Sequence, residues 1–278
     1  MIRLDRVVTL SFAASRRSDT RLSGRIPVLM YHGISHDEDT GRHPYYRTVT
    51  SPQVFEKQMA HLHRSGYSTI GVHQIRREVE GPAESAQLVS ITFDDGYHDF
   101  YVHAFPVLKK YGFTATVFLP SQFIAHQRRQ FRGRECMTWN EVRELKESGI
   151  SFGSHTVTHP QLRELDASDV KSEVSGSKCS IEQELGAPVD SFAYPYAFPE
   201  EDTEFKGRLR GILADAGYTC GVCTSVGRVT KQSDPYFMRR LPVNSCDDIR
   251  LFDAKLRGAY DWVSHPQKWA KSVKSWLR

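Results

Sequence analysis

The sequence predicts a single α/β domain in which about seven parallel strands close, or nearly close, into a barrel. Short apolar, β-branched segments alternate with helical segments from residue 26 to residue 257. Such alternation favours parallel strands that are joined by right-handed crossovers. No linker divides this region, and a chain of 278 residues that is 39% hydrophobic can bury one large core.

The strands are predicted where β-branched and aromatic residues form short apolar runs. Two of them end in groups that can do chemistry, because aspartates follow the third run and histidines follow the fifth. The expected strands are 26–31, 67–70, 88–93, 114–119, 150–153, 191–194, 218–223 and 239–243.

The helices are predicted from apolar residues at helical spacing and from capping residues. Ser51 and Pro52 supply an N-cap and a first helical residue, and Thr138 with Glu141 has the spacing of a capping box. Pro106 predicts a kink or a second start within the segment 97–111. The expected helices are 51–65, 72–79, 97–111, 138–148, 166–185, 202–216 and 247–257.

Residues 1–25 are rich in Arg and Ser without sustained periodicity, so we expect a flexible N-terminal extension before a catalytic domain over 26–278. Five cysteines without a second C-x-x-C pair predict a reducing, cytoplasmic location. The short apolar patch 7–14 leaves a secretory signal as the alternative.

The composition excludes some partners. No apolar run approaches the ~18–20 residues that span a bilayer, so no integral membrane segment is expected. The net charge of +4 comes from basic residues that are spread along the chain, which does not indicate a nucleic-acid binder. The oligomeric state is not encoded in any recognisable pattern.

Paired aspartates follow the apolar run 88–93. Asp94 and Asp95 would lie at the C-terminal end of a buried strand, where α/β enzymes place their reactive groups. Neighbouring strand residues point to opposite faces, so one carboxylate could bind a metal while the other acts as a base. A solvated Asp-Gly turn is the alternative for this motif alone.

Two histidines follow another predicted strand. His155 and His159 are four residues apart, so one turn would bring both imidazoles to one ion. Two imidazoles and a carboxylate suit a divalent ion, with zinc favoured and cobalt, nickel or iron as alternatives. Asp95 with both histidines on one barrel rim is a more specific pattern than either motif alone.

The motifs TFDDG and SHTVTH, with YHGI, FAYPYA and RLPV, resemble the polysaccharide deacetylase family, carbohydrate esterase family 4 or NodB homology domain. The resemblance runs from about Ile26 to Leu256. It implies a distorted (β/α) barrel and metal-dependent removal of acetyl groups from an N-acetylated glycan. Hydrolysis of a non-sugar amide, or a weakened glycan-binding protein, are the alternatives.

The resemblance also implies residue roles. Asp94 matches the general base, and Asp95, His155 and His159 match the metal ligands. The main-chain amide of Tyr196, or less closely that of Tyr194, matches the donor to the oxyanion.

The chain departs from the common pattern in two places. The third motif has a Tyr-Pro form, typical of exopolysaccharide-modifying deacetylases, and lacks the arginine that orients the base; we expect Arg240 to hold Asp94 instead, with a surface arginine as the alternative. The usual motif of the general acid is also absent. His32, at the end of the first strand, is a better candidate than His265 for lining the site, as an acid, a substrate contact or a core histidine.

A basic insertion spans residues 121–136. Its arginines are Arg128, Arg129, Arg132 and Arg134. The segment is either a substrate-facing lip for an anionic polymer or a solvated loop.

Overall fold

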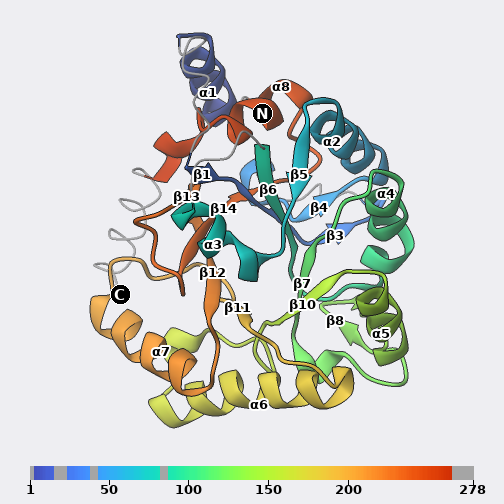
Figure 1. Ribbon diagram of the computed structural model, residues 1–278, viewed down its shortest axis with the longest axis vertical. Helices are drawn as coiled ribbons and strands as arrows, with labels where there is room; N and C mark the ends of the chain where they lie inside the picture. Colours follow the sequence, from blue (N-terminus) through green and yellow to red (C-terminus); the bar gives the residue numbers. More distant parts are fainter. Residues whose placement is uncertain (1–2, 16–23, 38–42, 82–86, 265–278) are drawn as a thin grey trace.

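The structure is a computed structural model that describes residues 3–15, 24–37, 43–81 and 87–264. Its centre is a closed barrel of seven parallel strands, which confirms the predicted fold class (Figure 1). Around the barrel the order is β2-β14-β12-β11-β10-β7-β6, and β2 pairs with β6 to close the ring. These strands are β2 (Val28–Tyr31), β6 (Gln87–Phe93), β7 (Thr116–Leu119), β10 (Ser151–Ser154), β11 (Ser191–Ala193), β12 (Cys220–Val226) and β14 (Met238–Pro242).

One predicted strand lies outside the ring. β5 (Tyr67–Thr69) pairs with the first half of β6, whereas β2 and β7 pair with the second half. Short pairs flank the barrel, namely β1 (Arg25–Ile26) with β13 (Val229–Thr230), β3 (Gly33–Ile34) with β4 (Val49–Thr50), and β8 (Gln130–Phe131) with β9 (Arg134–Glu135).

Helices surround the barrel, and α3 lies over its middle in the view of Figure 1. Ile75 of α3 packs with inward-facing strand residues such as Val28 and Val222, so this helix covers one end of the barrel. The helices outside the N-terminal segment are α2 (Pro52–Arg64), α3 (Ile75–Glu80), α4 (Phe105–Lys110), α5 (Trp139–Glu147), α6 (Ala167–Leu185), α7 (Thr203–Asp215) and α8 (Ile249–Leu256).

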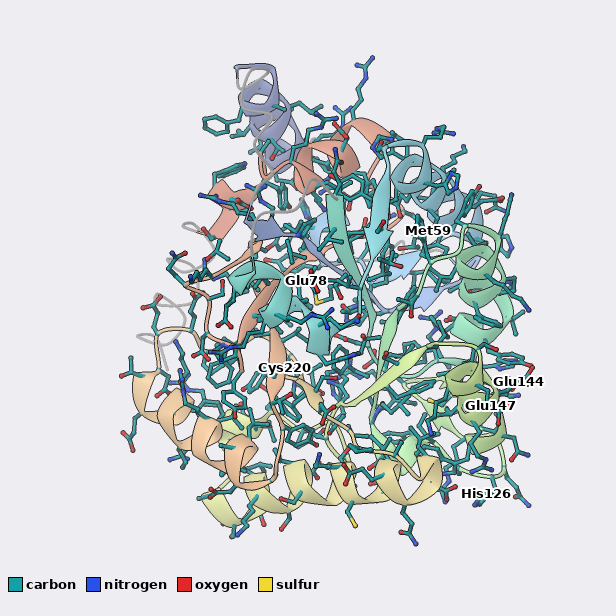
Figure 2. All side chains as sticks on the ribbon, viewed as in Figure 1. Met59, Glu78, His126, Glu144, Glu147 and Cys220 are labelled. Atoms are coloured by element: carbon teal, nitrogen blue, oxygen red, sulfur yellow. The ribbon has the colours of Figure 1, made fainter. Side chains whose placement is uncertain are left out.

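The alternation of strand residues separates two layers of core. Outward residues such as Val89, Ile91 and Phe93 of β6 join the large apolar layer beneath the helices, together with Met59 of α2. Cys220 belongs to the smaller cluster inside the barrel. In Figure 2, Glu144 and Glu147 lie at the outer edge on α5, away from both layers.

Local chemistry explains where the predicted helices begin. The Ser51 side chain accepts a hydrogen bond from the Val54 amide at the start of α2. Thr138 and Glu141 form the expected capping box at the start of α5. Segment 97–111 departs from a regular helix, because a π-helical turn (η3, Phe100–Ala104) precedes α4. Pro106 lacks an amide proton, which favours such a widened turn.

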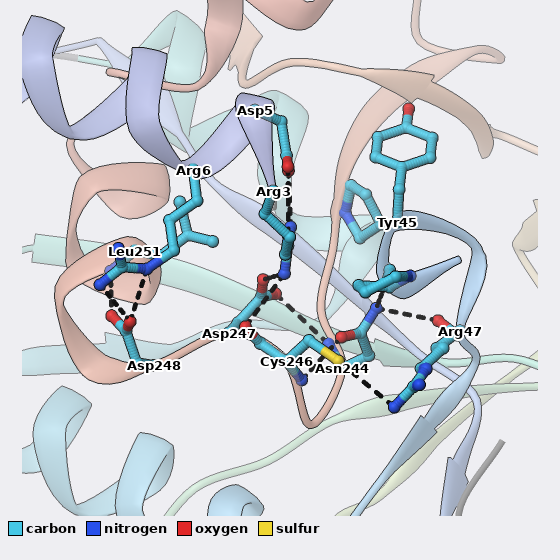
Figure 3. A network of polar contacts seen from close by, with 12 residues as sticks. Arg3, Asp5, Arg6, Tyr45, Arg47, Asn244, Cys246, Asp247, Asp248 and Leu251 are labelled. Atoms are coloured by element: carbon cyan, nitrogen blue, oxygen red, sulfur yellow. Dashed lines mark hydrogen bonds and ion pairs between the residues drawn. The ribbon is translucent and has the colours of Figure 1, made fainter. Parts of the chain in front are cut away.

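The N-terminal segment differs from the expected flexible extension. Leu4–Ser15 form the helix α1, which packs beside α8 (Figure 1). Figure 3 shows Arg3 and Arg6 reaching Asp247 and Asp248 at the start of α8. The docking of this helix depends on ionic contacts with distant residues that periodicity does not reveal. Residues 1–2 and 16–23 of the predicted extension lie outside the described residues.

In the described part of the chain, no helix has both the length and the apolarity needed to cross a membrane. All five cysteines are free thiols, and Cys220 and Cys223 are buried in β12 as small strand residues.

Candidate metal centre and active site

Asp94 and Asp95 leave β6 in different directions. Thr92 and Asp94 alternate on the face of β6 that points into the barrel, where both contact Arg240. Asp95 has a positive φ of 72°, which turns the chain out of the strand at the barrel rim. The two carboxylates therefore have different nearest partners, Arg240 for Asp94 and the two histidines for Asp95.

Three buried side chains converge at this rim. The Nε2 atoms of His155 and His159 lie 3.7 and 3.5 Å from Oδ1 of Asp95. The candidate ligand atoms all lie within 4.8 Å of one another. Asp95 Oδ1 is buried and has no hydrogen-bond partner within the described residues. An uncompensated carboxylate oxygen beside two imidazole nitrogens fits a divalent cation with nitrogen and oxygen ligands.

The environment of each ligand supports this fit. Burial raises the pKa of Asp95, and it lowers the pKa values of His155 and His159. His155 Nδ1 lies 2.8 Å from the Ala193 carbonyl, which can only accept, so this nitrogen carries the proton. Its Nε2 lone pair is then available toward Asp95, the arrangement that metal-binding histidines commonly have.

Backbone strain is concentrated at this rim. Among the described residues, five other than glycine have a positive φ, and they are Asp95, Arg132, Thr156, His159 and Tyr196. This conformation is uncommon for such residues and unusual for a β-branched one such as Thr156. The Thr156 hydroxyl accepts a hydrogen bond from the His159 amide, and the Thr156 carbonyl accepts one from Ser121. Surrounding contacts thus fix the strained loop, as is common at functional sites.

Arg240 holds Asp94 from inside the barrel. Its two terminal nitrogens donate to Oδ1 and Oδ2 of Asp94, each at 2.7 Å, and its Nε donates to the Cys223 carbonyl at 3.1 Å. Both side chains are almost completely buried. Burial raises the pKa of Asp94, but the charge and hydrogen bonds of Arg240, together with the nearby His155 and His32, outweigh this effect, and the pKa is well below its ordinary value. Asp94 is therefore an ionised carboxylate in a fixed orientation.

The remaining predicted residues lie around this pair. His32 Nε2 is 3.9 Å from Asp94 Oδ2, and burial lowers the pKa of His32. The Tyr196 ring packs on His159 with a centroid separation of 4.8 Å. The Tyr194 amide bonds the Val222 carbonyl, whereas the Tyr196 amide has no acceptor among the described residues. His265 lies outside the described residues.

Three residues near the site were not predicted to belong to it. Tyr97 hydrogen-bonds with Asp95, and its pKa is raised by burial and by that carboxylate. Glu173 of α6 accepts hydrogen bonds from the amides of Val157 and Thr158 and so holds the histidine loop. Arg132 lies near His159. Of these three residues, only Arg132 lies in a segment that the sequence had marked as a possible substrate contact, the basic insertion 121–136.

Comparisons with known proteins agree with this geometry. The family model described as polysaccharide deacetylase matches residues 81–221, about half of the chain. YxkH of Bacillus subtilis, which is assigned to the polysaccharide deacetylases, is 31% identical over 226 residues, 81% of this chain and 74% of that protein.

Two further relatives match over less of their length. The poly-β-1,6-N-acetyl-D-glucosamine N-deacetylase of Escherichia coli K12 is 28% identical over 46% of this chain, but only a fifth of that protein (20%) is covered. The Staphylococcus aureus enzyme of the same name (strain MSSA476) is 24% identical over 56% of this chain and about half of that protein (54%).

Solved structures show the same fold. The deacetylase PplD of Streptococcus pyogenes, solved with acetate, has a TM-score of 0.73 at 24% identity and covers 84% of this chain and 99% of that one. BC0361, a polysaccharide deacetylase of Bacillus cereus, has a TM-score of 0.69 at 25% identity over 84% of this chain and 69% of that one. From the matched family model, the extent of the likeness to YxkH and the shared barrel, we conclude that this chain belongs to the polysaccharide deacetylase family.

Proposed function

We propose that the protein is a metal-dependent hydrolase that removes N-acetyl groups from an acetylated saccharide or polysaccharide. The observation that carries this proposal is the buried group of Asp95, His155 and His159 beside the Asp94–Arg240 pair. The relatives that act on poly-β-1,6-N-acetyl-D-glucosamine support an acetylated glycan as the substrate class.

In this proposal, Asp95, His155 and His159 hold a divalent ion, with zinc as the first candidate. When bound, the ion would polarise the acetamide carbonyl and acidify the attacking water, so that a weakly basic carboxylate is sufficient to take its proton. Asp94 is that base. Arg240 keeps it ionised and oriented, and each carboxylate oxygen retains a lone pair for the water proton.

Two more groups complete the reaction. The Tyr196 amide, which has no other acceptor in the described part of the chain, donates to the oxyanion that forms on the acetyl carbonyl. His32, beside Asp94, is the candidate that passes a proton to the leaving amine. Arg240 has no contact with substrate in this scheme and acts through Asp94 as a positioning residue.

The direct test measures acetate release from N-acetylglucosamine oligomers and from capsular polysaccharides, with and without a chelator. The wild-type protein should release acetate from at least one glycan, and chelation should abolish the release. Asp94→Asn should keep the bound metal but lose about 100-fold or more in turnover, the scale expected for loss of a general base.

A control variant makes the same chemical change away from the site. Asp215 is exposed at the end of α7, so Asp215→Asn should retain wild-type turnover. If the protein binds one metal ion per chain but releases no acetate from any glycan, the proposal is overturned and a glycan-binding protein is favoured. Turnover by Asp94→Asn at the wild-type rate would remove Asp94 as the base.

A further inference from the structure

The arginines of the basic insertion are not equivalent. Arg128 pairs with Glu141 at 2.8 Å, Arg129 donates to the Gln122 carbonyl at 2.6 Å, and Arg134 pairs with Asp99. Arg132 makes no ion pair among the described residues, and its charge acts on the Asp95 carboxylate from a greater distance. Its only polar side-chain contact there is a long one of 3.5 Å to Nδ1 of His159. The insertion therefore presents one uncompensated cation at the candidate metal centre.

The fold holds this cation in place. Arg132 and Gly133 form the two-residue turn between β8 and β9, with φ values of 53° and 74°. Such a turn requires positive φ at both positions and normally selects Asn, Asp or Gly, so arginine is an unusual residue at the first one. The Arg132 guanidinium lies 4.9 Å from the ring centres of both Phe131 and Tyr196.

Neighbouring contacts fix the hairpin that carries Arg132. Phe131 is buried and packs on Phe123 at 4.5 Å between ring centres. Arg134 lies over the Tyr97 ring at 4.5 Å and pairs with Asp99. The hairpin is thus fastened on both strands by contacts that do not involve the Arg132 side chain.

The charges at the site determine which ligand Arg132 would favour. Arg240 neutralises Asp94, and a bound divalent ion would more than neutralise Asp95, so the positive charge of Arg132 is in excess at the site. A guanidinium that rests on aromatic rings keeps its N–H edge for a planar or tetrahedral anion, with which it can form two parallel hydrogen bonds. A neutral acetylated sugar offers no such partner.

We propose that Arg132 is a specificity-determining residue that binds a carboxylate or phosphate group on the glycan close to the reacting acetamide. The inference rests on the proposed deacetylation, because His159, which Arg132 contacts, is assigned to the metal centre. The enzyme would accordingly prefer acidic glycans to neutral ones.

The test compares matched substrates. The acidic substrate is an oligomer of alternating N-acetylglucosamine and uronic acid, and its neutral counterpart is the same oligomer with every carboxyl reduced to an alcohol. The third substrate is an N-acetylglucosamine oligomer that carries phosphate groups. It shows whether Arg132 prefers a phosphate or a carboxylate. For each, kcat/KM for acetate release is measured with wild type, Arg132→Gln, Arg132→Lys and Arg129→Gln.

Wild type should prefer an acidic oligomer by about 10-fold or more, the scale of a charge-assisted bidentate contact, and added salt should reduce this preference. The ratio should fall to about one in Arg132→Gln and to an intermediate value in Arg132→Lys, which keeps the charge without the fork. Arg129→Gln should leave the ratio unchanged, since Arg129 is used on the Gln122 carbonyl. Melting temperatures of all variants verify folding.

Other results would overturn the inference. These are equal rates on the acidic and neutral oligomers in wild type, a preference that survives in Arg132→Gln, or the same loss in Arg129→Gln. Calorimetric binding of the same oligomers separates this question from the reaction. If no oligomer releases acetate, the proposed function fails, while acid-selective binding that Arg132→Gln abolishes still supports the role of Arg132, and its absence overturns it.

Discussion

Individual residues at the barrel rim are driven by burial toward their neutral forms. Burial raises the pKa of Asp95 and lowers the pKa of His155, although a carboxylate beside an imidazole could form an ion pair. Asp94 differs, because Arg240 is directed at both of its oxygens. A bound cation would supply for Asp95 the compensation that Arg240 supplies for Asp94.

The metal ligands give a prediction for single residues. His155→Ala should lose the bound ion, because it removes the imidazole that the Ala193 carbonyl orients. An ion that binds only the folded state stabilises it by about 2.7 kcal/mol at 100 times its dissociation constant. Zinc should therefore raise the melting temperature of wild type and not that of His155→Ala. Elemental analysis and thermal melting measure the two effects.

The matched control for this change is His126→Ala. His126 is largely exposed, outside the candidate ligand group, so its loss should change neither the metal content nor the zinc-dependent melting shift. A His155→Ala protein that retains one ion per chain would remove His155 from the metal centre.

Among the elements, the β8–β9 hairpin is attached to the barrel at a close contact. A Cβ atom on Gly33 would lie 1.8 Å from Nη1 of Arg134, which pairs with Asp99. Gly33 therefore leaves space for the arginine that fastens the hairpin. This gives the glycine of the YHGI motif a structural reason that does not depend on the reaction.

Alanine at two glycines should have opposite effects on stability. Gly33→Ala should push the Arg134 guanidinium away from Asp99 and lower the free energy of unfolding by less than about 1.5 kcal/mol, because the added Cβ meets the end of a flexible side chain in a partly exposed pair. Gly211 is exposed within α7, where no atom lies within 4 Å of an added Cβ. Gly211→Ala should raise the free energy of unfolding by about 0.5–1 kcal/mol. Urea unfolding measures both, and equal effects would contradict the contact at Gly33.

Elements with local chemistry were predictable from sequence, and those that depend on distant contacts were not. Short local signals mark the starts of two helices. These are Ser51 with Pro52 at α2 and Thr138 with Glu141 at α5. The β8–β9 turn carries Arg132 where Asn or Gly would signal a hairpin, so it was not recognised. The helix α1 was missed because it is held by partners more than 240 residues away.

For the candidate site too, local motifs were predictable from the sequence and contacts between distant segments were not. The identities of Asp94, Asp95, His155 and His159 came from motifs at strand ends, and the expected contact between Arg240 and Asp94 is present. The sequence could not show that Tyr97 bonds Asp95 or that Arg132 reaches His159. The contact of Arg132 depends on how the insertion folds back over the rim, which no local pattern encodes.

At the scale of the whole molecule, α1 and α8 connect the two ends of the described chain through a buried ionic cluster. Asp247 accepts from Lys255 at 2.6 Å and from Arg3 at 2.9 Å, and all three side chains are buried or nearly so. Arg3 also pairs with Asp5, whose second partner is the Tyr260 hydroxyl. Trp262 donates to the Thr9 hydroxyl, which adds a contact on the same face.

Arg3, which precedes α1, and Arg6 within α1 should contribute unequally to stability. Arg3→Ala should lower the free energy of unfolding by about 1.5–3 kcal/mol, because it removes charge-assisted hydrogen bonds from buried partners. Asp247 retains Lys255, so the carboxylate is not left without a cation. Arg6→Ala breaks an exposed pair with Asp248 and should cost less than about 1 kcal/mol. Urea unfolding at pH 7 measures both, and equal losses would contradict the buried cluster.

Acid should reduce the difference in stability between wild type and Arg3→Ala, because this difference depends on the ionised carboxylate of Asp5. Burial raises the pKa of Asp5, but its hydrogen bond and charge interaction with Arg3 outweigh burial and lower the pKa below its ordinary value of 3.8. A carboxyl with a lowered folded-state pKa stabilises the fold fully above its unfolded pKa and loses that effect as the pH falls through the folded value. The stability gap between wild type and Arg3→Ala should thus be constant from pH 7 to about 5 and shrink below about pH 4. Urea unfolding across this range measures the gap, and a gap that widened in acid would show that Asp5 does not carry it.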